Sequence, residues 1–123
     1  INMFVGVWQG LDQEKLDIFK KNGMKIICDQ NEFGLKKLNE PAIYAWMHGD
    51  EPDNAQWNSS TQKYDPCIDP AIIIRDYLKI NETEPSRPVY LILGRGVLAS
   101  NSRGRGECTG RTDMYKGSSK GYL

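Results

Sequence analysis

The feature that most constrains the fold of this sequence is a set of four apolar segments with helix-like segments between them. The apolar segments are residues 1–8, 24–29, 42–51 and 87–94. They are rich in β-branched and aromatic residues, which is typical of β-strands. The last three are nearly continuous apolar runs, as expected of strands that are covered on both faces. Strands that alternate with helices predict an α/β fold in which βα units build a parallel sheet.

Two helical segments are expected in the first third of the chain. The first begins at Asp12, whose side chain can cap a helix, and ends at Gly23. The second, within residues 32–41, is one or two turns long at most, because Gly34 weakens it and Pro41 stops it.

A third helix is expected to begin at Asp69 and Pro70, which are favoured residues for the N-cap and for the first helical position. Ile73, Tyr77 and Ile80 recur at the spacing of one helix face and are expected to be its buried stripe.

The remaining segments read as loops. Residues 52–68 are rich in Pro, Asp, Asn, Ser and Thr and predict a long loop. Residues 95–123 are rich in Gly, Ser and Arg and predict another loop, with a short helix near residues 113–116. The chain of 123 residues is enough for one core, so residues 1–123 are expected to form a single domain.

Charge and residue usage argue against several classes of partner. Sixteen basic and sixteen acidic residues cancel, so the net charge gives no reason to expect nucleic acid or an anionic membrane as a partner. No apolar run approaches the roughly 20 residues of a membrane-spanning helix. With one histidine and three scattered cysteines, a histidine-rich metal centre is not expected, and no cofactor is implied. The compartment stays open.

The candidate functional residues follow the predicted strands. They are Trp8 at the end of the first strand, Asp29 at the end of the second with Glu32 just beyond it, His48, Asp50 and Glu51 at the end of the third, and Arg95 after the fourth. In parallel α/β sheets the functional groups collect at the carboxyl ends of the strands. A site at this edge of the sheet is therefore expected, although polar loops alone could give the same pattern.

Glu51 is the sharpest of these candidates. Strand alternation places Ala45, Met47, Gly49 and Glu51 on one face, and these slim residues suit a crowded barrel interior with Glu51 at its mouth. The competing interpretation is that Asp50 and Glu51 only open a turn before Pro52.

Alternatives also stay open for the other candidates. Asp29 and Glu32 could simply cap the short helix beside them, and His48 suits a core or supporting role better than a metal site. Trp57 lies in a polar loop, so its ring is a better candidate for stacking on a sugar than that of Trp46.

One rival motif points to nucleotide binding. Residues 94–99, GRGVLA, fit the dinucleotide fingerprint GxGxxA after a strand. The residues that follow do not favour a helix, and no second acid-ended strand follows, so this interpretation ranks last.

The segment WMHGDEPDNAQ at residues 46–56, together with FVGVWQG, KIICDQN and PVYLILGRGV around it, resembles a known family. It is similar to bacterial glycoside hydrolases of the large retaining clan built on (β/α)8 barrels, closest to uncharacterised β-galactosidase-like members. The resemblance implies that Glu51, at the end of the fourth barrel strand, is the general acid/base. A glutamate that ends the seventh strand is the nucleophile in that clan. The clan usually has asparagine where this chain has Asp50.

The resemblance also implies what this chain contains. Its strands match the second to the fifth of a TIM barrel, about half of such a domain, so the seventh strand falls outside the sequence. The expected function is retaining hydrolysis of O-glycosidic bonds on a carbohydrate substrate, in a piece that is inactive alone. The alternatives are a non-catalytic carbohydrate-binding half-barrel and the nucleotide-binding domain. Because residues 1–8 and 87–94 would be bare sheet edges, a homodimer or higher oligomer is expected.

Overall fold

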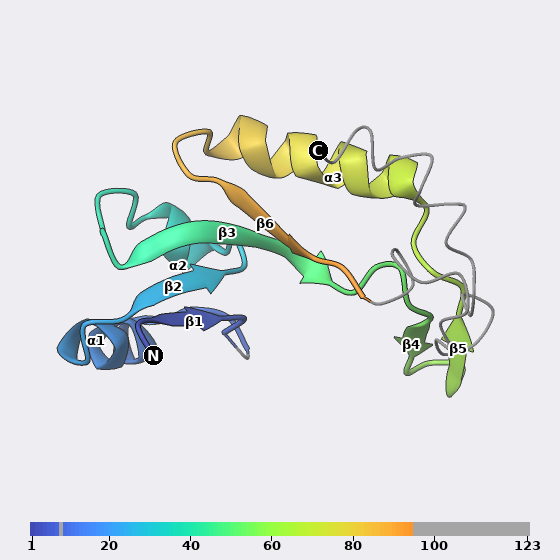
Figure 1. Ribbon diagram of the computed structural model, residues 1–123, viewed down its shortest axis with the longest axis horizontal. Helices are drawn as coiled ribbons and strands as arrows, with labels where there is room; N and C mark the ends of the chain where they lie inside the picture. The colour runs from blue at the N-terminus through green and yellow to red at the C-terminus, as the bar shows by residue number, and fades with distance from the viewer. Residues whose placement is uncertain (8, 95–123) are drawn as a thin grey trace. The chain divides into compact units, whose positions relative to one another are not determined.

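The computed structural model describes residues 1–7 and 9–94. Its main sheet contains four strands in the order β1-β2-β3-β6 (Figure 1). These strands are β1 Met3–Val5, β2 Lys25–Cys28, β3 Ile43–Asp50 and β6 Val89–Ile92. The helices are α1 Gln13–Lys21, α2 Glu32–Leu35 and α3 Pro70–Thr83, and each lies between two strands of this sheet in the sequence. The predicted α/β class is confirmed, and the four strands of this sheet and the helices between them occur in the predicted order. The half-barrel arrangement stays a prediction.

The strands of the main sheet are parallel. Met3 pairs with Lys25, and Val5 pairs with Ile27, so β1 and β2 run in the same direction. β2 and β3 are also parallel, with a shift in register between Ile26 and Ile27. Between β3 and β6, the Trp46 amide donates to Pro88 O at 3.0 Å, and the Glu51 amide donates to Ile92 O at 3.0 Å. Both partners advance along the chain together, as they do in a parallel pair.

The helix ends follow the local sequence. Asp12 is the N-cap of α1, and its side chain accepts a hydrogen bond from the Lys15 amide at 2.9 Å. The Asp69 side chain accepts from the Ala71 amide at 2.8 Å at the start of α3. In α3, Ile73 is buried as expected and Ile80 packs against the core, but Tyr77 is exposed. The predicted buried stripe was therefore wrong at Tyr77.

The core is built around β2, β3 and the helices that follow β1 and β2. Leu16 of α1, Ile26 and Cys28 of β2, and Trp46 of β3 are almost fully buried in one cluster. The Trp46 ring lies directly against Gly34 of α2, where an added Cβ would be 3.0 Å from a ring carbon. The glycine that weakens α2 as a helix therefore makes room for the indole.

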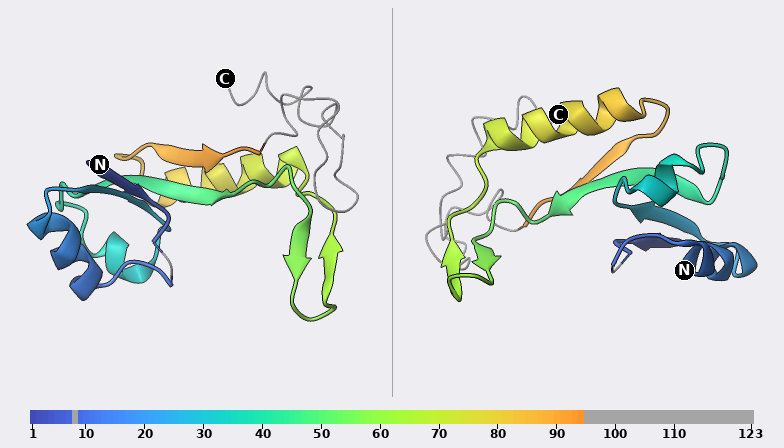
Figure 2. Two further views of the ribbon diagram at one scale, coloured as in Figure 1. Left: turned by 60° about the horizontal axis from the view of Figure 1, so that its bottom comes forward. Right: turned by 180° about the vertical axis from the view of Figure 1, so that it is seen from behind.

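Residues 52–68 are not the long loop that their composition predicts. They contain a second, two-stranded antiparallel sheet formed by β4 Gln56–Asn58 and β5 Lys63–Asp65 (Figure 2). Neither strand has an apolar run, so the composition of the segment concealed the hairpin.

The chain divides into two compact units, and each is described by itself. The first unit comprises residues 1–48 and 77–90, and the second comprises residues 49–76 and 91–123. The expectation of one domain over residues 1–123 stays a prediction. So does the expected self-association, although Phe4 and Val5 of the edge strand β1 are partly exposed.

Candidate functional site

Glu51 begins a tight turn directly after the last residue of β3. Its φ angle is +43°, in the left-handed region that residues with a Cβ rarely adopt. The backbone is held there from both sides: the Glu51 amide donates to Ile92 O, and Glu51 O accepts from the Asn54 amide at 2.9 Å. The Glu51 carboxylate accepts a second bond from Asn54, from Nδ2 to Oε2 at 2.6 Å. The strand end therefore fixes both the backbone and the carboxyl group of Glu51.

Asp53 lies two residues further on and is buried, with 3% of its surface exposed. Its Oδ1 accepts a hydrogen bond from the Gly94 amide at 2.5 Å. Its Oδ2 has no hydrogen-bond partner among the described residues. A Cβ on Gly94 would be 3.0 Å from both carboxylate oxygens, so only glycine leaves room for this contact. Asp53 thus connects the turn after β3 with the end of the fourth apolar segment.

The hairpin is attached to the same turn. Gln56, the first residue of β4, donates from Nε2 to Asn54 O at 2.8 Å and to Glu51 O at 3.2 Å. The Ile68 amide, beyond β5, donates to Pro52 O at 2.9 Å. Residues 53–67 are therefore an excursion that leaves and returns at the Glu51 turn. Asp50, the last residue of β3, is exposed.

The other candidates belong to the first unit or lie outside the described residues. His48 is half-buried in β3. Asp29 is exposed, and Glu32 is an exposed residue that forms an ion pair with Lys36 one helical turn away. Asn31, and neither of the two acids, caps α2: its side chain accepts from the Gly34 amide at 2.8 Å. The suggestion that Asp29 and Glu32 cap the helix was wrong. Trp8 and Arg95 lie outside the described residues, and so does most of the GRGVLA motif.

A polar cluster around the buried carboxylate of Glu84, in the first unit, was not predicted from the sequence. Trp46 Nε1 donates to Glu84 Oε2 at 2.8 Å, and Glu84 Oε1 accepts from the amide and the hydroxyl group of Ser86. Arg87 completes the cluster, with Nη1 3.4 Å from Glu84 Oε2 and its guanidinium 5.6 Å from the Trp46 ring centre. Arg87 also donates to Ile43 O and Leu38 O. We name Trp46, Glu84, Ser86 and Arg87 the Glu84 cluster.

The Glu84 cluster has a structural character. Burial raises the pKa of the Glu84 carboxyl, but hydrogen bonds from Ser86, Trp46 and Arg87 outweigh burial and lower the pKa to about 2. Glu84 is therefore ionised and fully engaged at neutral pH. The buried Cys28 thiol also has no reactive character. Burial, followed by the charge of Asp29, raises the pKa of this thiol to about 11, so it stays protonated at neutral pH.

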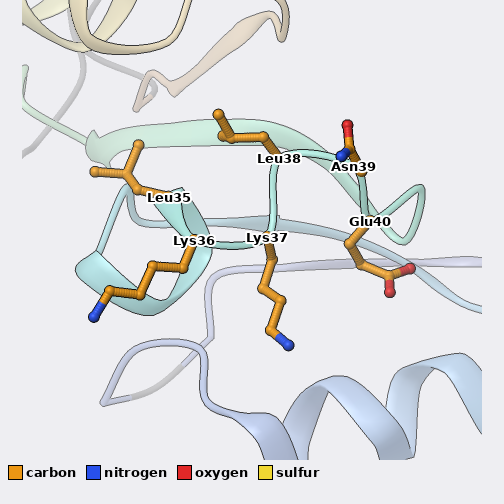
Figure 3. A pocket seen from close by; sticks show the side chains of 6 residues that line it. All are labelled: Leu35, Lys36, Lys37, Leu38, Asn39 and Glu40. Carbon is orange, nitrogen blue, oxygen red and sulfur yellow. The ribbon is translucent and has the colours of Figure 1, made fainter.

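The first unit also has a surface hollow of about 420 Å³. All six of its lining residues belong to the single stretch 35–40, which begins with the last residue of α2 (Figure 3). Its three charged side chains all have partners: Lys36 pairs with Glu32, Glu40 pairs with Lys20 of α1 at 2.8 Å, and Lys37 lies over the Phe33 ring at 5.5 Å. The hollow therefore offers no set of converging groups for a ligand.

The described part of the chain contains neither a metal cluster nor a membrane-spanning helix. Within residues 1–7 and 9–94, no three His, Cys, Asp or Glu side chains gather closely enough to hold a metal ion. None of the helices in this part of the chain combines the length and apolar character needed to cross a bilayer.

Comparison of the chain with protein-family models, with curated proteins and with solved structures gives no match. The geometry of the Glu51 turn is therefore the main observation that bears on function.

Proposed function

We propose that the chain is part of a retaining glycoside hydrolase in which Glu51 is the general acid/base. The observation that carries the proposal is the conformation of Glu51, a non-glycine residue with φ +43° at the carboxyl end of a parallel strand. Strained backbone of this kind costs about 1–3 kcal/mol and tends to occur at functional sites. Gln9 and Gln62 also have left-handed φ angles, but of the three only Glu51 directly follows a strand of the parallel sheet.

The surroundings of the Glu51 carboxyl suit this role. A general acid has to be held in one orientation, so that its proton meets the leaving oxygen of the glycosidic bond. The side-chain Nδ2 of Asn54 donates to the Glu51 carboxyl group at 2.6 Å and orients it. The Ile92 carbonyl group accepts from the Glu51 backbone amide and holds the backbone in place. Retaining hydrolysis also needs a second carboxylate about 5–5.5 Å away as the nucleophile. By the resemblance, that carboxylate ends the seventh strand of the barrel, so turnover requires the complete barrel.

The test compares two substrates in a full-length (β/α)8-barrel enzyme that contains the sequence of this chain. Glu51→Gln should lower the hydrolysis of an unactivated disaccharide by about 10²–10⁴-fold, the usual contribution of a general acid. Glycosylation by a dinitrophenyl glycoside should suffer far less, because that leaving group needs no proton. Glu82→Gln, at an exposed position of α3, is the matched control and should leave both rates unchanged. Equal losses on both substrates would make Glu51 a structural residue.

A non-catalytic carbohydrate-binding role is the second candidate, and Asp50 favours it. The clan that the sequence resembles usually has asparagine here to bind the sugar 2-hydroxyl, and the exposed Asp50 replaces it. Sugar binding that survives Glu51→Gln, with no turnover in the full-length enzyme on either substrate, would favour this role over hydrolysis.

A further inference from the structure

The hairpin β4–β5 has two chemically different faces. Trp57 and Tyr64 are directly opposite each other in the register, and strand alternation places their neighbours on the other face. That second face carries Gln56, Asn58, Lys63 and Asp65, and Asn58 Nδ2 donates to Asp65 Oδ2 across it at 2.8 Å. One face is therefore aromatic and the other polar.

The aromatic face is open to solvent. Trp57 is 54% exposed and Tyr64 is 43% exposed, whereas Trp46 in the core is 0% exposed. The two rings meet edge to face, with centroids 5.2 Å apart and an angle of 67° between their planes. This contact stabilises the hairpin, and it also leaves about half of the indole surface uncovered.

The hairpin is held in place by its own polar side chains. Asn58 Oδ1 accepts from the amides of Ser60 at 3.0 Å and Thr61 at 3.2 Å, and Gln62 Nε2 donates to Ser59 O at 2.7 Å. At the base, Gln56 bonds the carbonyl group of Glu51. The aromatic pair is therefore presented by an ordered turn that is attached to the proposed acid/base residue.

The chemistry of the segment selects the kind of ligand. Residues 54–62, NAQWNSSTQ, contain no ionisable side chain, only amides, hydroxyl groups, the methyl groups of Ala55 and Thr61, and the indole. The charged side chains of the hairpin, Lys63 and Asp65, lie on its other face, so the aromatic face carries no charge that would attract an anion or a charged peptide. A neutral sugar suits it, because the C–H groups on one face of a pyranose ring carry partial positive charge and pack on the negative face of an aromatic ring. The amides and hydroxyl groups can then bond the sugar hydroxyls.

We propose that Trp57 and Tyr64 form a stacking platform for a pyranose unit of a neutral oligosaccharide. The platform rests on the proposed glycosidase function and adds to it a subsite that binds the substrate without taking part in the chemistry. Trp57 supplies the stacking surface, and Tyr64 positions the indole through the edge-to-face contact.

The direct test is a titration of the 123-residue chain with cellotetraose and with β-1,4-galactotetraose, followed by tryptophan fluorescence and by the indole NMR signals. Binding of at least one tetrasaccharide should perturb the signal of Trp57 and leave that of the buried Trp46 unchanged. Trp57→Leu keeps an apolar contact with Tyr64 but removes the aromatic face. It should raise Kd about tenfold or more, the size of loss expected for a central aromatic anchor. Trp57→Phe should give an intermediate Kd.

Two controls test whether a loss of binding comes from the exposed ring of Trp57. Tyr77→Ala removes a ring on α3 with the same 43% exposure as Tyr64 and should leave Kd unchanged. Far-ultraviolet circular dichroism should show that the Trp57 variants stay folded. An unchanged Kd in Trp57→Leu, or no binding of either tetrasaccharide at millimolar concentration, would overturn the platform. So would a finding that Trp57→Leu abolishes only self-association in sedimentation experiments.

The platform and the proposed hydrolysis fail in different ways. In the full-length enzyme, Trp57→Leu should raise KM with little change in kcat, as expected when uniform binding is lost. Glu51→Gln should lower kcat while the chain still binds the tetrasaccharide. An unchanged KM in Trp57→Leu, together with a large loss of kcat in Glu51→Gln, rejects the platform alone. Binding through Trp57 with no effect of Glu51→Gln on kcat rejects the acid/base role and leaves a binding module.

Discussion

Glu84 and Asp53 are both buried carboxylates, but the two regions that contain them differ. Glu84 is 4% exposed, and both of its oxygens are engaged, by Trp46, Ser86 and Arg87. Asp53 is similarly buried, yet among the described residues only Oδ1 has a partner, the amide of Gly94. The backbone two residues before Asp53 is strained at Glu51, and the backbone at Glu84 is regular.

The Glu84 carboxylate stabilises the fold, whereas the conformation of the Glu51 turn lowers the stability of the folded chain. A buried charge is tolerated when hydrogen bonds and a countercharge satisfy it, which is the case for Glu84. The Glu51 turn instead combines a left-handed residue with a buried carboxylate, that of Asp53, of which only one oxygen has a partner among the described residues. Features of this kind concentrate at functional sites. Burial alone would not have distinguished the two regions.

The largest expected effect comes from removing Glu84. Glu84→Ala leaves the Arg87 guanidinium and the Trp46 N–H without their buried partner, so the free energy of unfolding should fall by about 3–5 kcal/mol. Glu82→Ala, an exposed acid in α3, is the matched control and should change it by less than about 0.5 kcal/mol. Urea denaturation followed by circular dichroism measures both. Similar small losses in the two variants would contradict the structural role of the Glu84 cluster.

The Glu84 cluster also predicts a smaller, pH-dependent effect. The pKa of Glu84 is about 2 in the folded chain and has an ordinary value of 4.5. A lowered pKa contributes stability that is fully present above pH 4.5 and is lost as the pH falls towards 2. The stability of the wild-type chain should therefore fall through this window more steeply than that of Glu84→Gln. Parallel curves for the two proteins, from urea midpoints between about pH 2 and pH 6, would show that Glu84 is not held ionised.

The smallest effect tests the strain at Glu51. Glu51→Ala and Glu51→Gly both remove the carboxyl group and its bond to Asn54, but only glycine relieves φ +43°. The glycine variant should therefore be the more stable of the two by about 1 kcal/mol.

At the helical position Asp76 the order should reverse, with glycine less stable than alanine by about 1 kcal/mol. Thermal or urea denaturation of the four variants provides the measurement. If alanine were more stable than glycine at both positions, the Glu51 turn would carry no strain. The contrast between Glu51 and Glu84 would then no longer hold.

The sequence predicts the local features of this chain well. The caps Asp12 and Asp69 and the glycine-limited helix α2 are set by residues within a few positions of one another, and so they could be recognised. Composition could not reveal the β4–β5 hairpin, because its strands QWN and KYD lack an apolar pattern and its turn contains no glycine. The cross-strand pair of Trp57 and Tyr64 holds the hairpin together, and a pair of that kind becomes visible only in the register.

The site shows the same limit more clearly. Glu51 stood out because it ends an apolar segment, and in the structure it directly follows the last residue of β3. The contacts that distinguish the two carboxylates join residues far apart in sequence: Glu84 with Trp46 across 38 positions, and Asp53 with Gly94 across 41. Such contacts depend on which strands become neighbours, and local patterns carry no information about that choice.

The closed base of the excursion at residues 53–67 has a consequence for how this protein can diverge. The bond from Ile68 to Pro52 brings the two ends of the excursion together, so its interior can change length without moving the strand that carries Glu51. Each doubling of a loop's length costs only about 0.6 kcal/mol in closure entropy. Insertions, deletions and exchange of the hairpin are therefore expected to accumulate between residues 57 and 65 among descendants of this chain, beyond Gln56, which bonds the Glu51 turn. The residues of the hairpin that contact a ligand can then change during evolution, while the turn that holds Glu51 keeps its structure.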